Sequence, residues 1–225
     1  MRKLSLLART LFQLAVIWMP WWLRRRVLRT IGFELHETSR IGLSLILADK
    51  VILDEGARID NFTLVSPVAY IHLHRFALIG RGNRIVGRQR TRFYVSEADR
   101  VSALVMEEHA HVTRNHVLDC TNHLTIGRFA LIAGWNSQIL THSPDFDLAR
   151  QASAPLRIGA YSFLGTRCIV LKGANIADYS VLAAGSVMHR ASTEPYILWS
   201  GVPATAVRRL NPDAEFFSRK VGAIS

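Results

Sequence analysis

Residues 158–188 read IGAYSFLGTRCIVLKGANIADYSVLAAGSVM. A large apolar residue returns at every sixth position: Ile158, Leu164, Val170, Ile176, Leu182 and Met188. A small residue follows the first five of these by four positions: Ser162, Cys168, Ala174, Ser180 and Ser186. A period of six matches neither a helix nor a simple alternating strand. The pattern predicts short strands joined by turns, stacked so that the apolar side chains form one continuous core.

An earlier stretch has the same period, at Ile41, Leu47, Leu53, Ile59, Val65 and Ile71. The phase shifts by two between residues 71 and 79 and again between residues 132 and 158, and the pattern blurs around residues 88–92. A shift of phase marks extra residues, so we expect loops that leave the stack at these points. Loops on a rigid scaffold are frequent places for functional residues.

The repeat resembles the left-handed parallel β-helix of the hexapeptide-repeat acyltransferases, with three hexapeptides in each triangular coil. The resemblance covers about residues 38–210. It implies a mainly β protein with three parts: a basic, apolar helical segment over residues 1–37, a left-handed β-helix over residues 38–210, and a short helix over residues 211–225. Asn211 is the expected N-cap of the last helix.

Composition limits the class of protein. The chain has 225 residues and is 49% hydrophobic, and this apolar content excludes a disordered chain. Its formal net charge of +11 favours an acidic partner. Seven of those charges lie in the first 30 residues, beside several tryptophans, and no nucleic-acid motif is present, so we expect no nucleic-acid partner. Cys120 and Cys168 lack the spacing of a zinc site or a disulfide scaffold, and we expect them to fill tight interior positions.

The apolar segment over residues 4–23 is marginal in length for a membrane-spanning helix. Its apolar residues recur at helical spacing, and Pro20 is expected to end or kink the helix. Three tryptophans precede three arginines here: Trp18, Trp21, Trp22, Arg24, Arg25 and Arg26. This pattern fits attachment to an anionic membrane surface through residues 1–30 and fits packing on the domain or on a neighbouring subunit equally well, and the sequence leaves both open. No small-residue cleavage site supports a signal peptide.

The loop over residues 141–157 begins Thr-His-Ser-Pro-Asp-Phe-Asp and lies directly before the regular run at Ile158. This order is similar to that of the galactoside and maltose O-acetyltransferases. The resemblance implies that His142 is the catalytic base, since a neutral imidazole accepts a hydroxyl proton near neutral pH. With His142 as the base, the acyl transfer needs no acyl-enzyme intermediate. Asp145 or Asp147 is expected to orient the imidazole or bind the acceptor, with Asp145 favoured; the alternative is a solvated turn.

The resemblance also implies a helper asparagine one or two coils before His142. Asn115 is the best candidate, and Asp119 and Asn122 remain open. A ladder of stacked polar side chains is the alternative for all three.

The segment Trp199–Leu210 resembles the Gly-x-Pro-Ala-x-x-(Ile/Val)-(Arg/Lys)-(Arg/Lys) ending of coenzyme A-dependent members. By that resemblance Gly201 lets a ligand approach the backbone closely, and Arg208 or Arg209 meets a coenzyme phosphate. The implied acyl donor is acetyl-CoA, with no metal. The matching positions implied for coenzyme binding are Gly165, Ala183, Gly201, Pro203, Ala204, Arg208 and Arg209.

The resemblance implies transfer of acetyl to a hydroxyl, or to an amine, of a saccharide such as a polysaccharide precursor. It also implies a homotrimer in which two chains share each site. With the basic N-terminus, it places the protein in the cytoplasm, peripheral on the inner face of the membrane. Two alternatives remain: a γ-class carbonic anhydrase-like zinc protein of the same fold, and a non-catalytic β-helix platform on a membrane. The histidines for the zinc alternative are His109, His111, His116 and His123.

Overall fold

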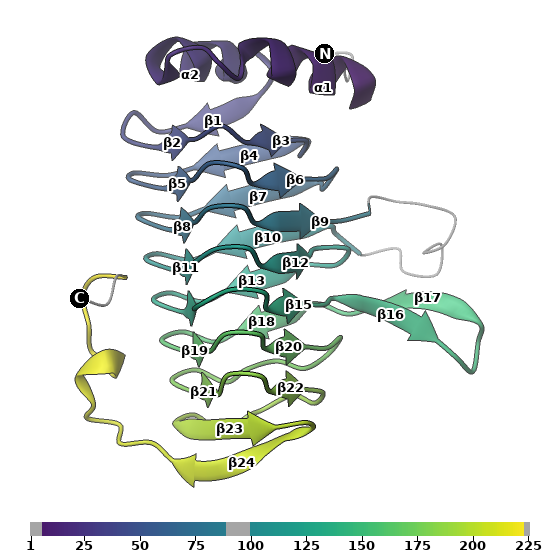
Figure 1. Ribbon diagram of the computed structural model, residues 1–225, viewed down its shortest axis with the longest axis vertical. Coiled ribbons are helices and arrows are strands. Elements are labelled where there is room, and N and C mark those ends of the chain that lie inside the picture. The colour runs from purple at the N-terminus through teal and green to yellow at the C-terminus, as the bar shows by residue number, and fades with distance from the viewer. Residues whose placement is uncertain (1–5, 89–99, 223–225) are drawn as a thin grey trace.

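The computed structural model describes residues 6–88 and 100–222. Its coils stack into a three-walled prism, and two helices, α1 (Leu6–Val16) and α2 (Trp21–Thr30), lie across one end (Figure 1). The mainly β, left-handed β-helix expected from the period of six is therefore confirmed. Within the described residues, neither helix has the length and apolar content needed to cross a membrane.

Three parallel sheets form the walls, and the chain visits them in turn as A, B and C. Wall A contains β1 (Phe33–Leu35), β4 (Lys50–Leu53), β7 (Tyr70–Leu73), β10 (Ala103–Met106), β13 (Leu124–Ile126) and β18 (Leu156–Ile158). Wall B contains β2 (Arg40–Ile41), β5 (Arg58–Ile59), β8 (Leu78–Ile79), β11 (His111–Val112), β14 (Leu131–Ile132), β19 (Phe163–Leu164), β21 (Val181–Leu182), β23 (Ile197–Gly201) and the antiparallel β24 (Ala204–Arg209). Wall C contains β3 (Leu45–Ile46), β6 (Leu64–Val65), β9 (Arg84–Val86), β12 (Val117–Asp119), β15 (Gln138–Ile139), β20 (Ile169–Val170) and β22 (Val187–Met188).

The six-residue pattern marks the inside of the prism. All six large residues of the run from Ile158 to Met188 are buried, as are the five small residues between them. In the earlier run the prediction is off by one residue at Leu47, because Ile46 is the residue that pairs with Val65 in the wall C ladder. The predicted inward positions therefore match the buried residues, except in the first coil, where the prediction is off by one residue.

The A–B corner carries a continuous stack of aromatic rings. Neighbouring centroids are 4.7–5.4 Å apart, and every residue of the stack has a φ of 54–60°. This left-handed region normally favours glycine, so ring stacking compensates a backbone cost repeated in each coil. The stack consists of Phe76, His109, Phe129, Tyr161, Tyr179 and Tyr196.

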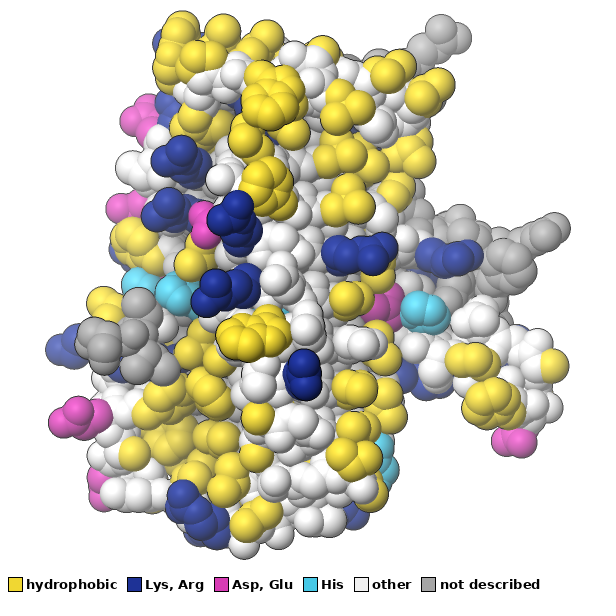
Figure 2. Space-filling view, viewed as in Figure 1, with side chains coloured by type: hydrophobic (Ala, Val, Ile, Leu, Met, Phe, Trp, Pro, Cys, Tyr) yellow, Lys and Arg dark blue, Asp and Glu magenta, His cyan; other side chains and the backbone are white. Residues whose placement is uncertain are grey.

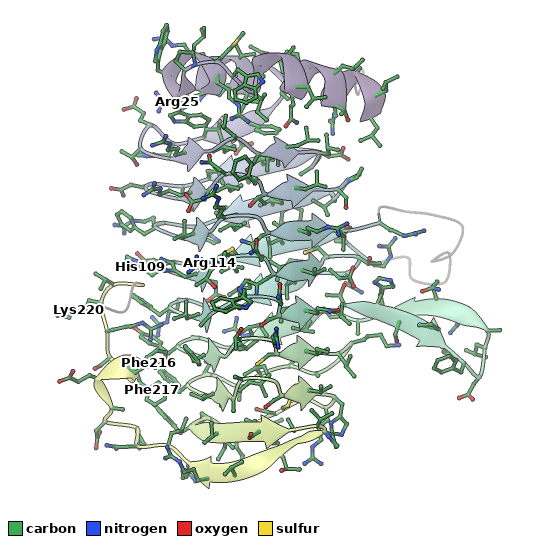
Figure 3. The ribbon with its side chains drawn as sticks, in the orientation of Figure 1. Arg25, His109, Arg114, Phe216, Phe217 and Lys220 are labelled. Atoms are coloured by element: carbon green, nitrogen blue, oxygen red, sulfur yellow. The ribbon has the colours of Figure 1, made fainter. Side chains whose placement is uncertain are left out.

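The C-terminal segment runs back along this aromatic stack (Figures 1 and 3). Phe217 meets Tyr179 and Tyr196 edge-on, with centroids 5.9 and 5.4 Å apart, and the Arg219 guanidinium lies over Tyr161. The helix expected over residues 211–225 is reduced to one 3-10 turn, Glu215–Phe217. Contacts with the stack hold the rest of the described segment against the prism instead. Residues 223–225 lie outside the described part.

The N-terminal segment also differs in its boundary. Pro20 separates α1 from α2, as expected of a residue that ends a helix. The first wall strand begins at Phe33, inside the segment expected to precede the β-helix, because Phe33 and Leu35 pair with β4 and face the core. The β-helix therefore starts five residues before position 38.

Polar side chains of the helices satisfy the open edge of the first coil. Among the described residues, no coil lies beyond this edge, so its backbone groups need other partners. The Gln13 amide binds both backbone groups of Ile46: its Nε2 donates to the carbonyl at 2.5 Å, and its Oε1 accepts from the N–H at 2.9 Å. Arg24 donates to the carbonyls of Gly42 and Ser44 at 2.7 and 3.0 Å, and Trp21 Nε1 donates to Ser39 at 3.0 Å. The two helices thus cap the prism.

Replacing Gln13 by alanine is expected to lower the free energy of unfolding by about 2–4 kcal/mol, because two buried backbone groups lose their partners. Urea unfolding at pH 7 measures this change. The control is Gln138→Ala, which removes an exposed glutamine from β15 and is expected to change stability by less than about 0.5 kcal/mol. An equal loss in both variants would contradict the capping role.

Candidate functional site

His142 lies where the chain leaves the prism at the C–A corner. After β15 the backbone forms an antiparallel hairpin of β16 (His142–Asp145) and β17 (Arg150–Ser153), which projects from the side of the prism (Figure 1). The Ala154 N–H donates to the Thr141 carbonyl at 2.9 Å, and this bond closes the neck of the hairpin. His142, the first hairpin residue, is therefore held next to wall C.

A buried carboxylate one coil earlier holds the imidazole. His142 Nδ1 donates to Asp119 Oδ2 at 2.6 Å; the His142 side chain is 34% exposed and that of Asp119 only 2%. The same oxygen accepts from the backbone N–H groups of Thr141 and His142, at 2.8 and 3.0 Å. Oδ1 accepts from the N–H and hydroxyl of Thr121 at 3.0 and 2.7 Å. Asp119 therefore fixes both the neck of the hairpin and its first side chain.

This arrangement selects one state of the ring. Burial alone would raise the pKa of the Asp119 carboxyl, but the hydrogen bonds from His142 and Thr121 and the charge of His142 outweigh it and lower that pKa. Because Asp119 is an acceptor, the neutral His142 ring carries its proton on Nδ1. Nε2 then has a free lone pair, and it has no hydrogen-bond partner within residues 6–88 and 100–222. Such a ring can accept a proton from a bound hydroxyl or amine.

More polar groups surround the neck of the hairpin. Asn122 Nδ2 donates to Ser153 Oγ at 3.0 Å, and Ser153 faces His142 across the hairpin. The next residue, His123, lies beside Tyr70 on wall A, with its Nδ1 3.5 Å from the phenol oxygen. Burial lowers the pKa of His123 and raises that of Tyr70. These groups form a polar, uncharged surface from the hairpin onto wall A.

Of the three candidate helpers, the structure brings Asp119 and Asn122 to the hairpin. Asn115 lies at the B–C corner, where its φ is 56° and its backbone binds Arg81 and Asn136 in the adjacent coils at 3.0 Å. It lies before β12 (Val117–Asp119), whereas Asp119 is the last residue of that strand. Asn115 and His142 therefore lie near opposite edges of wall C within one chain.

Asp145 lies at the far end of β16. It pairs with Arg150, and its Oδ1 accepts from the Leu148 N–H at 3.1 Å, so its carboxylate supports the hairpin turn. Asp119, and not Asp145, is the residue hydrogen-bonded to His142.

Most residues implied for coenzyme binding share one edge of the prism. Gly165 and Ala183 directly follow β19 and β21, which are neighbours in wall B, and Gly201 ends β23 in the next coil. Gly201 has a φ of 105° and pairs with Ala204 across the turn that contains Pro203. These five residues lie along the B–C corner of the last coils. His142 leaves wall C at its other edge.

Arg208 and Arg209 are placed elsewhere. They lie at the far end of β24, where Arg209 pairs with Ile197 beside the A–B corner. The distance from Ala204 to Arg208 along the strand is about 13 Å. Both arginines are exposed. The coenzyme segment therefore presents small residues at one end and two cations at the other.

The histidines of the zinc alternative do not converge. His109 belongs to the aromatic stack, His123 faces Tyr70, and His111 lies on β11. His116 is buried: its Nδ1 accepts from Ser137 N–H at 3.1 Å, and its Nε2 donates to Thr113 Oγ1 at 3.0 Å. Burial lowers its pKa to about 4, so the ring is neutral and both nitrogens have protein partners. Within one chain, these four histidines therefore do not come together.

Sequence reasoning missed a different cluster on wall A. Asp54 Oδ2 lies 3.2 Å from both His72 Nε2 and His74 Nδ1. Among the described residues, this set has ligand atoms close enough to hold a metal ion. His72 lies on β7 and His74 directly follows that strand, so alternation places both on the outer face, and that signal is weak in a sequence with nine histidines.

Comparisons with known proteins find the fold and no close relative. No protein-family model matches the chain, and no curated protein matches it in sequence. A mutant of AntD, an N-acyltransferase from Bacillus cereus, solved with dTDP and coenzyme A, is similar with a TM-score of 0.54 and 13% identity, over 86% of this chain and 94% of that one. A hexapeptide-repeat acetyltransferase from Vibrio cholerae, solved with acetyl coenzyme A, is similar with a TM-score of 0.52 and 17% identity, over 92% and 88%. This chain therefore has the β-helix fold of the hexapeptide-repeat acyltransferases.

The lowered pKa of Asp119 predicts a dependence of stability on pH. Its ionised form stabilises the folded state above the unfolded-state pKa, near 4, and this contribution is lost as the pH falls through the lower folded-state pKa. Urea unfolding at pH 7 and pH 3 should show a smaller acid-induced loss in Asp119→Asn than in the wild type. Asp145→Asn, in the hairpin turn, should keep the wild-type dependence. The same loss in Asp119→Asn and the wild type would contradict the prediction.

Proposed function

We propose that this chain is an acetyl-CoA-dependent O-acetyltransferase that acts on a saccharide hydroxyl, with His142 as general base. The observation that carries the proposal is the His142–Asp119 hydrogen bond at the neck of a hairpin on this fold. The similarity to coenzyme A-bound acyltransferases supports the reaction class and the donor.

The residues of the chain divide the proton transfer between them. Nε2 of His142 takes the proton of the acceptor hydroxyl as its oxygen attacks, and the Asp119 carboxylate stabilises the imidazolium that forms. When bound, acetyl-CoA supplies the thioester carbonyl. The imidazolium then returns the proton to the leaving sulfur. Cys120 and Cys168 are buried, and burial raises the pKa of both thiols, which supports direct transfer without an acyl-enzyme.

The donor set of the last coils fits a phosphorylated thioester. Arg208 and Arg209 offer exposed cations for the phosphates. Ala183, Gly201 and Pro203 offer a backbone edge with small side chains for the pantetheine arm, and the buried Gly165 and Ala204 lie beneath it. For the acceptor, Asn122, Ser153 and Tyr70 offer amide and hydroxyl groups near the hairpin, as a saccharide requires. A glycan or polysaccharide precursor is the acceptor class we favour.

We further propose that the active assembly is a homotrimer. His142 and the B–C corner lie at opposite edges of wall C, so a second chain must present its coenzyme edge to the hairpin of the first. A closed ring of three prisms would repeat this contact three times. The proposed donor and acceptor also favour a cytoplasmic location, and nucleic acid has no part in this reaction.

Replacing His142 by alanine is expected to lower the rate of acetyl transfer about 100- to 10,000-fold, because the acceptor proton loses its base. Thioester consumption with a panel of saccharides and amino sugars measures the rate. Acetyl-CoA should still raise the melting temperature of the variant, since binding does not need the imidazole. His36→Ala is the control: His36 is an exposed histidine of the first coil, far along the stack from the hairpin, and its loss should leave the rate unchanged. Unchanged transfer by His142→Ala would overturn the proposed function.

Co-expression of two inactive variants tests whether two chains share each site. His142→Ala and a double Arg208→Ala, Arg209→Ala variant, co-expressed, should regain about a quarter of wild-type activity, because random trimers then contain intact sites. No recovery, with trimers confirmed by light scattering, would place each site within one chain.

A further inference from the structure

The helix α1 exposes four leucines, while the residues that it buries against the prism are Gln13 and Val16. An ordinary surface helix buries its apolar stripe and exposes its polar face. In α1, Gln13 is 2% exposed and binds the first coil, and Arg9 reaches the same coil through Asp49 at 2.6 Å. The leucines on the other side are 49–68% exposed: Leu6, Leu7, Leu11 and Leu14. The requirement to cap the backbone edge with polar groups therefore leaves the apolar face outside.

This outer face continues onto the connection between the two helices. Trp18 is 80% exposed and Trp22 is 59% exposed. Figure 2 shows hydrophobic side chains gathered over the end of the prism that α1 and α2 cover. A monomeric protein rarely exposes a continuous apolar surface of this kind without using it. We call it the cap face; its exposed apolar residues are Leu6, Leu7, Leu11, Leu14, Trp18, Met19 and Trp22.

Positive charge adjoins the cap face. Arg26 is exposed and lies over the Trp22 ring, with Cζ 5.8 Å from the ring centroid, and Arg29 is exposed on the same helix. Residues 1–33 contain no aspartate or glutamate. Two copies joined through this face would bring their arginines together with no acidic partner from the same segment. The charge therefore favours an anionic occupant over a second copy of the chain.

We propose that the cap face binds the surface of an anionic phospholipid bilayer. Leucines and tryptophans of an interfacial helix enter the boundary between headgroups and acyl chains, while nearby arginines meet the phosphates. At 11 residues, α1 is about 16 Å long, so it lies in the surface and does not cross it. The inference is independent of the acetyl transfer proposed above.

The docked orientation also places the hairpin. Both helices lie across the end of the prism (Figure 1), so a cap face on the bilayer directs the coils away from it. From β3 to β15 the wall C ladder advances by four strands, or about 19 Å. His142 would then stand clear of the headgroups, at a height that suits the saccharide part of an acceptor.

Vesicle co-sedimentation of the full-length protein tests the proposal. The protein should pellet with vesicles of equal parts phosphatidylcholine and phosphatidylglycerol, more than with phosphatidylcholine alone, and high salt should release it. Trp18→Gln should weaken this binding about ten-fold and Arg26→Gln about five-fold. The matched control is Trp135→Gln: Trp135 is also exposed beneath an arginine, Arg114 at 5.8 Å, but lies on the B–C corner (Arg114 is labelled in Figure 3).

Three results would overturn the inference. The wild type stays in the supernatant with the anionic vesicles, or Trp135→Gln loses as much binding as Trp18→Gln. The third result is that the wild type does not bind vesicles but self-associates in sedimentation velocity, and that Trp18→Gln abolishes this self-association. A second copy of the chain would then cover the cap face. Acetyl transfer to a soluble saccharide should be equal in Trp18→Gln and the wild type, which separates this test from that of the proposed function.

Discussion

Parallel backbone pairing between successive coils is the constraint on which the rest of this structure depends. Each wall strand is two to six residues long and is held by the strands before and after it in the stack, so an insertion within a wall would break the ladder. Extra residues are accommodated at the corners, and unpaired backbone remains at the two ends. The special features of this protein accordingly lie at corners and ends.

The corners and ends meet this constraint with different side chains. At the A–B corner, stacked rings accompany left-handed backbone in coil after coil. At the C–A corner, the hairpin departs, and the buried Asp119 carboxylate binds its neck and orients His142. At the first coil, Gln13 and Arg24 replace the missing strand, and this use of polar residues leaves apolar ones exposed. The catalytic and membrane proposals thus begin from the same need to satisfy backbone where the ladder is interrupted.

The walls were predictable from sequence because burial repeats every six residues, and the break before Ile158 located the hairpin and His142. The partner of His142 was harder to identify. Asp145 is near in sequence, but Asp119 is one coil away, and only the register of Leu118 with Ile139 reveals that it is a neighbour. Asn115 lies on the same coil as Asp119 but at the B–C corner. An error of four residues in the sequence alignment therefore selects a residue at the wrong edge of wall C. The sequence left open whether the apolar residues of α1 face outward, and it gave no sign that Gln13 binds the backbone of Ile46.

The central claim is that Asp119 holds His142 in the tautomer that leaves Nε2 free to accept a proton. Nitrogen-15 NMR of histidine-labelled protein at neutral pH, with the His142 signals assigned through a His142→Gln variant, tests this most directly. We predict that the neutral form of the ring carries its proton on Nδ1, and that this preference is lost in Asp119→Asn. A ring protonated on Nε2 in the wild type, or one unaffected by the Asp119 substitution, would contradict the account.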